Sequence, residues 1–552
     1  MGFSNLALTL EEIAETTPNR PAVVFTTGYD RDGWAQYTQR TFKELNTLCD
    51  QYAHGILNYG IKKGDRVLIL VSPSVDMIAI CFALLKVGAV PVVIDPGMKR
   101  SAYLRCVEDT EPSAFIGIPK AHFLRYFYPS SFNTVTHPII IGKRGFLNTP
   151  TLTSLLPEKE KSFQAVLLND DTEIAVAFTS GSTGIPKGVI YQQGTFRAQF
   201  ELMRDEIGIK PGEVDLPGLL SFSLFGPALG ISEIFPDMDP THPAQVDPAK
   251  LVQTLQKYQV TNSFGSPIIW RRVADHCLKH DLQLPTIHRI LMAGAPVPPS
   301  LIKDLKQVLV NGEIYTPYGA TEAMPLTLMS GTEILEETAQ LSEQGSGLCV
   351  GRPVHNATIK IITITDDVIP EWEDGLEISQ GEIGEIVVKG PMVTQEYLNR
   401  PKNTALAKIY DGEDVWHRMG DLGYYDEKSR LWFCGRKTHR VETSNGLVLP
   451  VPCEAIFNLH PNVYRSAVVG VGENNHQEAV LVIETQPGKH PRNLSEKETF
   501  VNELLELGKQ YQITHPIQKV LFYPKGFPVD VRHNAKIDRL ELGRWAEKQL
   551  RS

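Results

Sequence analysis

A loop rich in glycine and hydroxyl residues, TSGSTGIPKG at residues 179–188, follows an apolar run that predicts a strand over residues 174–178. Glycines let the backbone turn tightly and bring several N–H groups to one anion, and hydroxyl groups add further donors. The lysine adds a positive charge, and the glycine after it excludes a Walker loop, which requires Ser or Thr there. Since a flexible linker seldom follows a buried strand directly, we expect the loop to bind phosphate. The predicted phosphate-binding residues are Thr179, Ser180, Gly181, Ser182, Thr183, Gly184 and Lys187.

Two further segments place suitable groups after predicted strands. In AGAPVP, residues 293–298, the small residues Gly294 and Ala295 allow a flat ring to approach the backbone. In YTPYGATE, residues 315–322, Tyr318 supplies an aromatic face, Gly319 leaves room and Thr321 supplies a hydroxyl. The same segment ends in Glu322, whose carboxylate is a hard oxygen ligand of the kind that Mg²⁺ prefers. We therefore predict that both segments contact a nucleotide.

Three later residues are candidate site residues only because the nucleotide-binding segments precede them. Asp421 follows WHRMG, and its two oxygens can accept from a vicinal diol, although a lone Gly-Asp pair is more often a surface turn. Arg436 lies in FCGRKTHRV, and Lys536 lies in NAKIDR, a basic run that in isolation reads as a solvated loop.

These motifs, in this order, resemble the signature of the adenylate-forming superfamily of acyl-CoA synthetases, luciferases and nonribosomal peptide adenylation domains. The resemblance implies an ATP-dependent ligase in which Thr321 contacts the α-phosphate and Glu322 holds Mg²⁺. It also implies that Lys536 bridges the substrate carboxylate and the α-phosphate, so that Lys536, Thr321 and Glu322 are the expected catalytic residues. The remaining expected nucleotide-binding residues are Gly294, Ala295, Tyr318, Gly319, Asp421 and Arg436. The sequence departs from the family at Thr438, where the hinge residue is usually Asp or Lys.

The elements that must position these residues alternate between helix and strand. Helical spacing at residues 42–59 precedes an apolar β-branched run at 66–71, and a second helix expected at about 75–87 precedes a strand at 90–94. This alternation predicts α/β layers with parallel strands. Period-two alternation at 381–391 predicts a small β-barrel-like subdomain. We therefore expect a large, multi-layered α/β N-terminal domain over residues 1–436, followed by a small, mobile α+β domain over residues 437–552.

Composition narrows the class of protein. A chain of 552 residues with 42% hydrophobic content can bury several cores, and a formal net charge of −10 argues against a nucleic-acid partner. Seven cysteines without C-x-x-C spacing indicate a reduced, cytoplasmic compartment. The apolar run at 77–93 contains Lys86 and glycine, so it predicts a helix and a strand and no transmembrane segment.

The segments between the motifs suggest a substrate. FPDMDPTHPAQVDP at 235–248 and FGSP at 264–267, together with the motifs, are similar to the olefin-biosynthesis β-lactone synthetases. This resemblance implies a fatty acid or β-hydroxy fatty acid substrate, with ATP and Mg²⁺, and raises association with other enzymes of hydrocarbon biosynthesis. Phe222 or Phe225 would shape the acyl pocket, although either is as readily a core residue.

Three alternatives remain open. A medium- or long-chain fatty acyl-CoA ligase would also use CoA, and a fatty acyl-AMP ligase would stop at the adenylate. A nucleotide-binding sensor without chemistry would be expected to have lost Glu322 or Lys536, and both are present.

Overall fold

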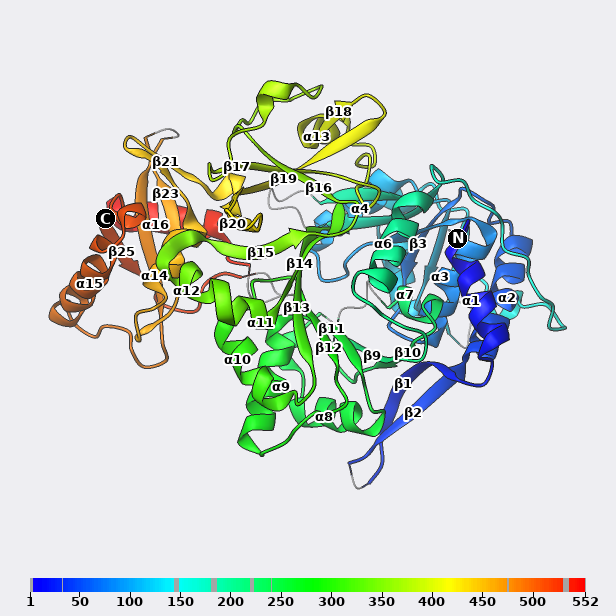
Figure 1. Cartoon of the computed structure of the whole chain (residues 1–552). Helices are drawn as coiled ribbons and strands as arrows, with labels where there is room; N and C mark the ends of the chain where they lie inside the picture. Colours follow the sequence, from blue (N-terminus) through cyan, green and yellow to red (C-terminus); the bar gives the residue numbers. More distant parts are fainter. Residues whose placement is uncertain are drawn as a thin grey trace.

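The computed structural model of the chain describes residues 3–31, 33–142, 148–179, 186–218, 223–239, 241–473, 476–529 and 536–551. Helices and strands alternate along most of it, and the expected α/β fold is confirmed. The helices are α1 (Leu6–Thr16), α2 (Phe42–Tyr59), α3 (Val75–Val87), α4 (Arg100–Thr110), α5 (Pro119–Phe127), α6 (Gln193–Asp205), α7 (Phe225–Ala228), α8 (Pro248–Lys257), α9 (Pro267–Lys279), α10 (Pro299–Val308), α11 (Gly331–Glu333), α12 (Ala339–Leu341), α13 (Pro401–Ala407), α14 (Pro450–Phe457), α15 (Leu494–Lys509) and α16 (Arg539–Arg551). Figure 1 shows α1, α2 and α3 at one end of the molecule and α14, α15 and α16 at the other.

One sheet of the described residues carries the flanks of the predicted phosphate loop. Its order is β6-β5-β3-β4-β7-β8, with all neighbours parallel except β7 and β8. The strands are β3 (Arg66–Leu70), β4 (Val90–Val93), β5 (Ala114–Gly117), β6 (His137–Ile140), β7 (Glu173–Thr179) and β8 (Lys187–Gln192). Strand β8 is a feature that the sequence analysis missed. It pairs antiparallel with β7, so the glycine-rich segment connects the two strands of a hairpin.

The helix α3 lies inside the protein and explains the apolar run at 77–93. Its residues from Ile78 to Val87 are buried, and the run continues into β4. Lys86 is fully buried, and its ammonium lies 2.5 Å from a carboxylate oxygen of Asp50 and 2.6 Å from one of Glu11. A charge in an interior helix is thus matched by two carboxylates, as a buried charge requires.

A second sheet joins the parallel and antiparallel parts of the chain. Within the described residues it has 14 strands, in the order β16-β17-β19-β20-β15-β14-β13-β12-β11-β9-β10-β1-β2, with β18 paired to β19. Strands β9 to β13 and β1 form the parallel part, and β14 begins the antiparallel part. The bounds are β1 (Pro21–Tyr29), β2 (Ala35–Thr41), β9 (Val214–Pro217), β10 (Ser232–Phe235), β11 (Asn262–Gly265), β12 (Arg289–Met292), β13 (Glu313–Ala320), β14 (Ala323–Ser330), β15 (Leu348–Pro353), β16 (Thr358–Ile362), β17 (Gly384–Lys389), β18 (Lys408–Asp411), β19 (Asp414–Tyr425) and β20 (Leu431–Arg436). The β-region expected around residues 381–391 corresponds to β16–β20, with β17 at its centre.

Strands β9 and β10 bring two carboxyl groups together in the interior. Asp215 and Glu233 are register partners, and both are almost completely buried. Burial raises the pKa of Asp215 to about 7, and burial together with the neighbouring Asp215 raises that of Glu233. The Asn262 amide donates to Asp215, so the pair is held in place by a third strand.

The residues after β20 fold around sheets of their own. Strands β21 (Val441–Thr443) and β22 (Gly446–Val448) form a hairpin, and β23 (Val463–Val471), β24 (Glu478–Thr485) and β25 (Lys519–Phe522) form a second sheet. Helix α15 and the sheet enclose one apolar cluster, and α16 covers another on Ala467, Val480 and Val482. No helix among the described residues is long and apolar enough to cross a membrane. All seven cysteines are buried and unbridged.

Candidate active site

The centre of the site is the tight connection between β13 and β14. Ala320 pairs with Ala323, which leaves Thr321 and Glu322 at the tip. At Gly319 a Cβ atom would lie 2.6 Å from the Ala323 carbonyl oxygen, so a side chain there would collide with the facing strand. The glycine expected from the sequence is therefore required by the approach of β14.

Glu322 is fixed by a segment that the sequence analysis did not single out. The Thr394 N–H and hydroxyl donate to the Glu322 carbonyl at 2.9 and 3.1 Å. The Tyr397 hydroxyl donates to the carboxylate oxygen Oε1 at 2.7 Å, and burial raises the pKa of this phenol. On the other side of the tip, the Tyr191 hydroxyl donates to the Thr321 carbonyl at 2.7 Å. Both residues of the tip are thus oriented by side chains from distant parts of the chain.

The ends of the predicted phosphate loop reach the same place. Residues Ser180, Gly181, Ser182, Thr183 and Gly184 lie outside the described residues, as does the side chain of Thr179, but β7 and β8 bring both ends of the loop together. Lys187 opens β8, and its ammonium lies 4.7 Å from the centre of the Tyr397 ring. Burial lowers the pKa of Lys187, and the charge of Glu322 opposes that effect. Lys187 therefore lies beside the tyrosine that holds the Glu322 carboxylate.

Behind this cluster lie two buried basic residues that sequence reasoning missed. Lys408 and His417 face each other across β18 and β19, and the Lys408 ammonium donates to the Thr394 carbonyl. Burial lowers the pKa of Lys408 to about 7, with the charge of Glu322 acting in the opposite direction. Burial, reinforced by Lys408 and Lys187, holds the pKa of His417 well below its usual range. Both residues occur in unremarkable strand sequences, so no pattern in the sequence marks them.

Asp421 and Arg436 form the other side of the site. They are register partners on β19 and β20, and the Arg436 guanidinium donates to Asp421 Oδ1 at 2.7 Å. The Tyr318 hydroxyl donates to Asp421 Oδ2 at 2.7 Å, which joins these two residues to β13. The negative charge of Asp421 raises the pKa of Arg436, and burial beside Asp421 raises that of Tyr318. Each carboxylate oxygen can accept further hydrogen bonds.

Gly294 and Ala295 follow the carboxyl end of β12, next to the strand that carries Tyr318. Gly294 has a φ of +87°, a left-handed conformation that glycine adopts without strain. The structure therefore brings Gly294, Ala295, Tyr318 and Gly319 to neighbouring strand ends, where open α/β sheets bind their ligands.

The described residues that follow Lys536 interact with Glu454 and influence His439. Lys536 is exposed, and two residues later the chain reaches Asp538 and Arg539, whose guanidinium donates to Glu454 at 2.8 Å. Burial, reinforced by the charges of Arg539 and Arg436, lowers the pKa of His439 to about 4. Arg539 therefore lies close enough to His439 for its charge to act there, and the position of Lys536 beside the α-phosphate stays a prediction.

The predicted hinge residue Thr438 is exposed within a short turn, Lys437–His439. The residues on either side are tied to the N-terminal part of the chain. The Lys437 ammonium donates to the Thr365 carbonyl at 2.7 Å and lies 3.0 Å from Glu385 Oε1, and Arg440 is paired with Asp366 at 2.5 Å.

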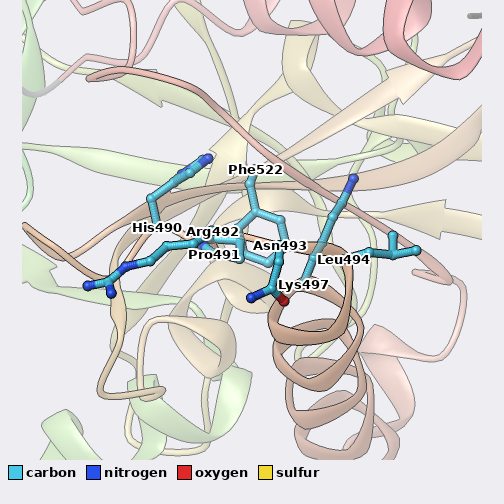
Figure 2. Close-up of a pocket in the computed structure, with 7 residues that line it drawn as sticks. All are labelled: His490, Pro491, Arg492, Asn493, Leu494, Lys497 and Phe522. Carbon is cyan, nitrogen blue, oxygen red and sulfur yellow. The ribbon is translucent and has the colours of Figure 1, made fainter.

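Only one of the two phenylalanines expected to shape the acyl pocket is described by the structure. Phe222 is outside the described residues, and Phe225 is buried with its ring 4.5 Å from that of Phe196. A surface groove of about 270 Å³ at the start of α15 contains none of the predicted site residues, and Figure 2 shows the side chains that line it. Its helix terminus is already capped, because the Asn493 side chain accepts from the Glu496 N–H.

Comparison with known proteins gives matches along the whole chain. A family model described as AMP-binding enzyme matches residues 10–398. The olefin beta-lactone synthetase of Xanthomonas campestris pv. campestris is 41% identical over 558 aligned residues, which cover 99% of this chain and 98% of that protein.

Solved structures share the fold. The amide bond synthetase McbA from Marinactinospora thermotolerans has a TM-score of 0.78 and 19% identity, over 98% of this chain and 99% of that one. The O-succinylbenzoate CoA synthetase MenE of Bacillus subtilis, solved with ATP and magnesium ion, has a TM-score of 0.74 and 20% identity, over 97% and 98% of the two chains.

Proposed function

Because the chain belongs to the family of AMP-binding enzymes, we propose that it uses ATP to adenylate a long-chain β-hydroxy fatty acid and then closes the adenylate to a β-lactone. The observation that carries the first step is that Glu322 and Lys187 both contact Tyr397, while the Asp421–Arg436 pair is joined through Tyr318 to the strand that leads to Glu322. Together they supply a metal ligand, a cation for phosphate and a polar pair for ribose.

In the first step a carboxylate oxygen of the acid attacks the α-phosphorus of ATP. A new P–O bond forms, the bond to the β-phosphate oxygen breaks, and pyrophosphate leaves with the electron pair. Residues 179–184, Lys187 and the Thr321 hydroxyl would bind the phosphate oxygens, and Lys536 would neutralise charge between the carboxylate and the α-phosphate. Such groups act by positioning and by stabilising developing charge.

Magnesium fits the residues present. Within the described ranges no group of three His, Cys, Asp or Glu side chains could hold a metal. Mg²⁺ in nucleotide enzymes is commonly held by one or two carboxylates together with phosphate oxygens and water, and Glu322 provides one such carboxylate. The bound ion would supply charge stabilisation on the phosphates.

The nucleoside would lie across the neighbouring strand ends. Gly294, Ala295 and Tyr318 would contact adenine, with Gly319 leaving room, and Asp421 and Arg436 would bind the ribose hydroxyls. Asp421 suits this role because a carboxylate can accept from both hydroxyls of a vicinal diol.

In the second step the β-hydroxyl oxygen attacks the acyl carbon of the adenylate. The ring C–O bond forms, the acyl C–O bond to AMP breaks, and the hydroxyl proton is released. The identity of 41% to an olefin beta-lactone synthetase over nearly the whole chain supports this step. Well-oriented intramolecular attack reaches effective concentrations of about 10⁵–10⁸ M, which offsets part of the strain of a four-membered ring.

The proposal includes the organisation and setting of the enzyme. Residues 1–436 would form the adenylation domain, and residues 437–552 a mobile domain that carries Lys536; the separate sheets and apolar clusters of the latter support this division. A cytoplasmic location and association with other enzymes of hydrocarbon biosynthesis complete the proposal.

The test is analysis of the products from a long-chain β-hydroxy acid and MgATP, with and without CoA. We expect a β-lactone, AMP and pyrophosphate without CoA. ¹⁸O in the β-hydroxyl should appear in the ring oxygen, whereas ¹⁸O in the carboxylate should divide between AMP and the lactone carbonyl. Acyl-CoA formation from unsubstituted fatty acids, with no lactone, would instead identify an acyl-CoA ligase, and accumulation of the adenylate a fatty acyl-AMP ligase.

A further inference from the structure

A cluster of aromatic side chains projects from the short helix α5. Phe123, Tyr126 and Phe127 are 44%, 61% and 66% exposed, and they share one side of the helix because they are three and four residues apart. Phe123 and Phe127 are the exposed phenylalanines of the described residues. Ala121 and His122 of the same helix are buried against the protein.

The three exposed rings contact one another. The Phe123 and Phe127 ring centres are 6.3 Å apart, and those of Tyr126 and Phe127 are 5.4 Å apart. A soluble protein usually exposes such side chains singly, so a cluster of three marks an interaction surface.

Positive charge borders these rings. A groove of about 450 Å³ is lined by Arg100, Lys120, Phe123, Leu124, Phe127 and Tyr128. The Arg100 guanidinium carbon lies 5.5 Å from the centre of the Tyr128 ring. Lys120, in the first turn of α5, and Lys99, the residue before α4, are exposed. We call Arg100, Lys120, Phe123, Tyr126 and Phe127 the α5 surface.

This positive region stands out from the rest of the protein. The chain has a formal net charge of −10, yet no Asp or Glu occurs in the sequence between residues 112 and 157. The acidic residues of α4 next to that segment are already engaged. Glu108 accepts from the Ser131 hydroxyl at 2.6 Å, and Asp109 pairs with Arg400. The α5 surface is therefore complementary to a negatively charged partner.

We propose that the α5 surface docks on an anionic lipid bilayer. The aromatic side chains would enter the boundary between head groups and acyl chains, and Arg100 and Lys120 would contact lipid phosphates. Aromatic rings combined with flexible cations are typical of protein segments that lie in this boundary, and attraction to anionic lipid adds to burial of the rings.

The position of the helix suits delivery of an amphiphilic substrate. Helices α4 and α5 are the elements that follow β4 and β5, whose carboxyl ends lie at the same edge of the parallel sheet as that of β7. This advantage rests on the proposed function, whereas binding to lipid does not, so the two can be tested separately.

The experiment is flotation of the full chain with vesicles of equal parts phosphatidylcholine and phosphatidylglycerol, and with phosphatidylcholine alone. We expect binding to the anionic vesicles, weakened by high salt, and little binding to the neutral ones. The double variant Phe123→Ser/Phe127→Ser and the single variant Lys120→Glu should each lower the partition coefficient about tenfold or more. The matched control Leu494→Ser, which replaces an exposed side chain on α15, should bind as the parent does.

Unchanged melting temperatures would show that the variants fold, and Lys120→Glu tests the surface without altering a ring. Equal flotation of parent and variants, or no binding of the parent to anionic vesicles, would overturn the proposal. The proposal would also be overturned if the parent did not bind lipid and the variants changed oligomeric state, because the rings would then contact a second copy of the chain. Because no turnover is measured, a negative result for lipid leaves the proposed reaction unaffected.

Discussion

Lys408 allows a quantitative test of the electrostatics behind Glu322. This residue is 1% exposed, and burial lowers its pKa to about 7 from 10.5. Since the folded protein holds the proton less tightly than the unfolded chain, this group makes stability rise with pH between about 7 and 10.5. We expect Lys408→Met to remove that dependence.

The two pKa values give the magnitude. Relative to a side chain that does not titrate, Lys408 costs about 4 kcal/mol of unfolding free energy at pH 7 and about 2 kcal/mol at pH 9. The lost hydrogen bond to the Thr394 carbonyl costs about 1 kcal/mol at both pH values. The variant should therefore be more stable than the parent at pH 7, by a margin that shrinks by about 2 kcal/mol at pH 9.

Thermal unfolding of both proteins at the two pH values measures this margin as a difference in Tm. The matched control is Lys86→Met, which leaves the buried carboxylates of Asp50 and Glu11 without their partner. That variant should be destabilised by about 3–5 kcal/mol. If Lys408→Met were destabilised as strongly, or if its Tm difference were the same at both pH values, Lys408 would be an ordinary charged lysine compensated by Glu322.

Four further outcomes are expected. Tyr397→Phe should raise the Mg²⁺ concentration needed for half-maximal activity about tenfold, with little change in Tm, because a hydrogen bond to a carboxylate is worth about 1.5–3 kcal/mol. An unchanged Mg²⁺ titration would show that Tyr397 does not position Glu322. Asp421→Ala should raise the KM for ATP much more than that for the acid, measured by pyrophosphate release, and equal losses would indicate misfolding instead. Lys536→Ala should lower pyrophosphate release by about two orders of magnitude or more at unchanged Tm, and full activity would remove this lysine from the mechanism. Asp215→Asn should stabilise the protein by about 1–2 kcal/mol at pH 8 and by less at pH 5. The reason is that the raised pKa of this carboxyl makes the stability of the parent fall as pH rises from about 4 to about 7. A Tm difference that does not change with pH would contradict this reasoning.

The sequence alone predicted the elements that have a strong local pattern. Helices α2 and α3 have the expected bounds. Helix α2 buries one face whose period is visible in the residues themselves, whereas α3 is buried on all sides from Ile78 to Val87 and shows itself as an almost continuous apolar run. The family resemblance rested on short motifs whose chemistry is local, such as the glycine-rich loop and YGATE. Strand β8 was missed because KGVIYQ is short, and its pairing with β7 is set across the loop.

Only the tertiary structure decided how the motif residues are supported. Nothing in the sequence around Tyr397, Thr394 or Lys408 indicates that they orient Glu322, since their contacts cross 14 to 75 residues of chain. In the same way, Asp421 is joined to Tyr318 over 103 residues. A motif fixes which groups are available for chemistry, but the direction of each group depends on buried hydrogen bonds to partners that meet only when the sheets have formed.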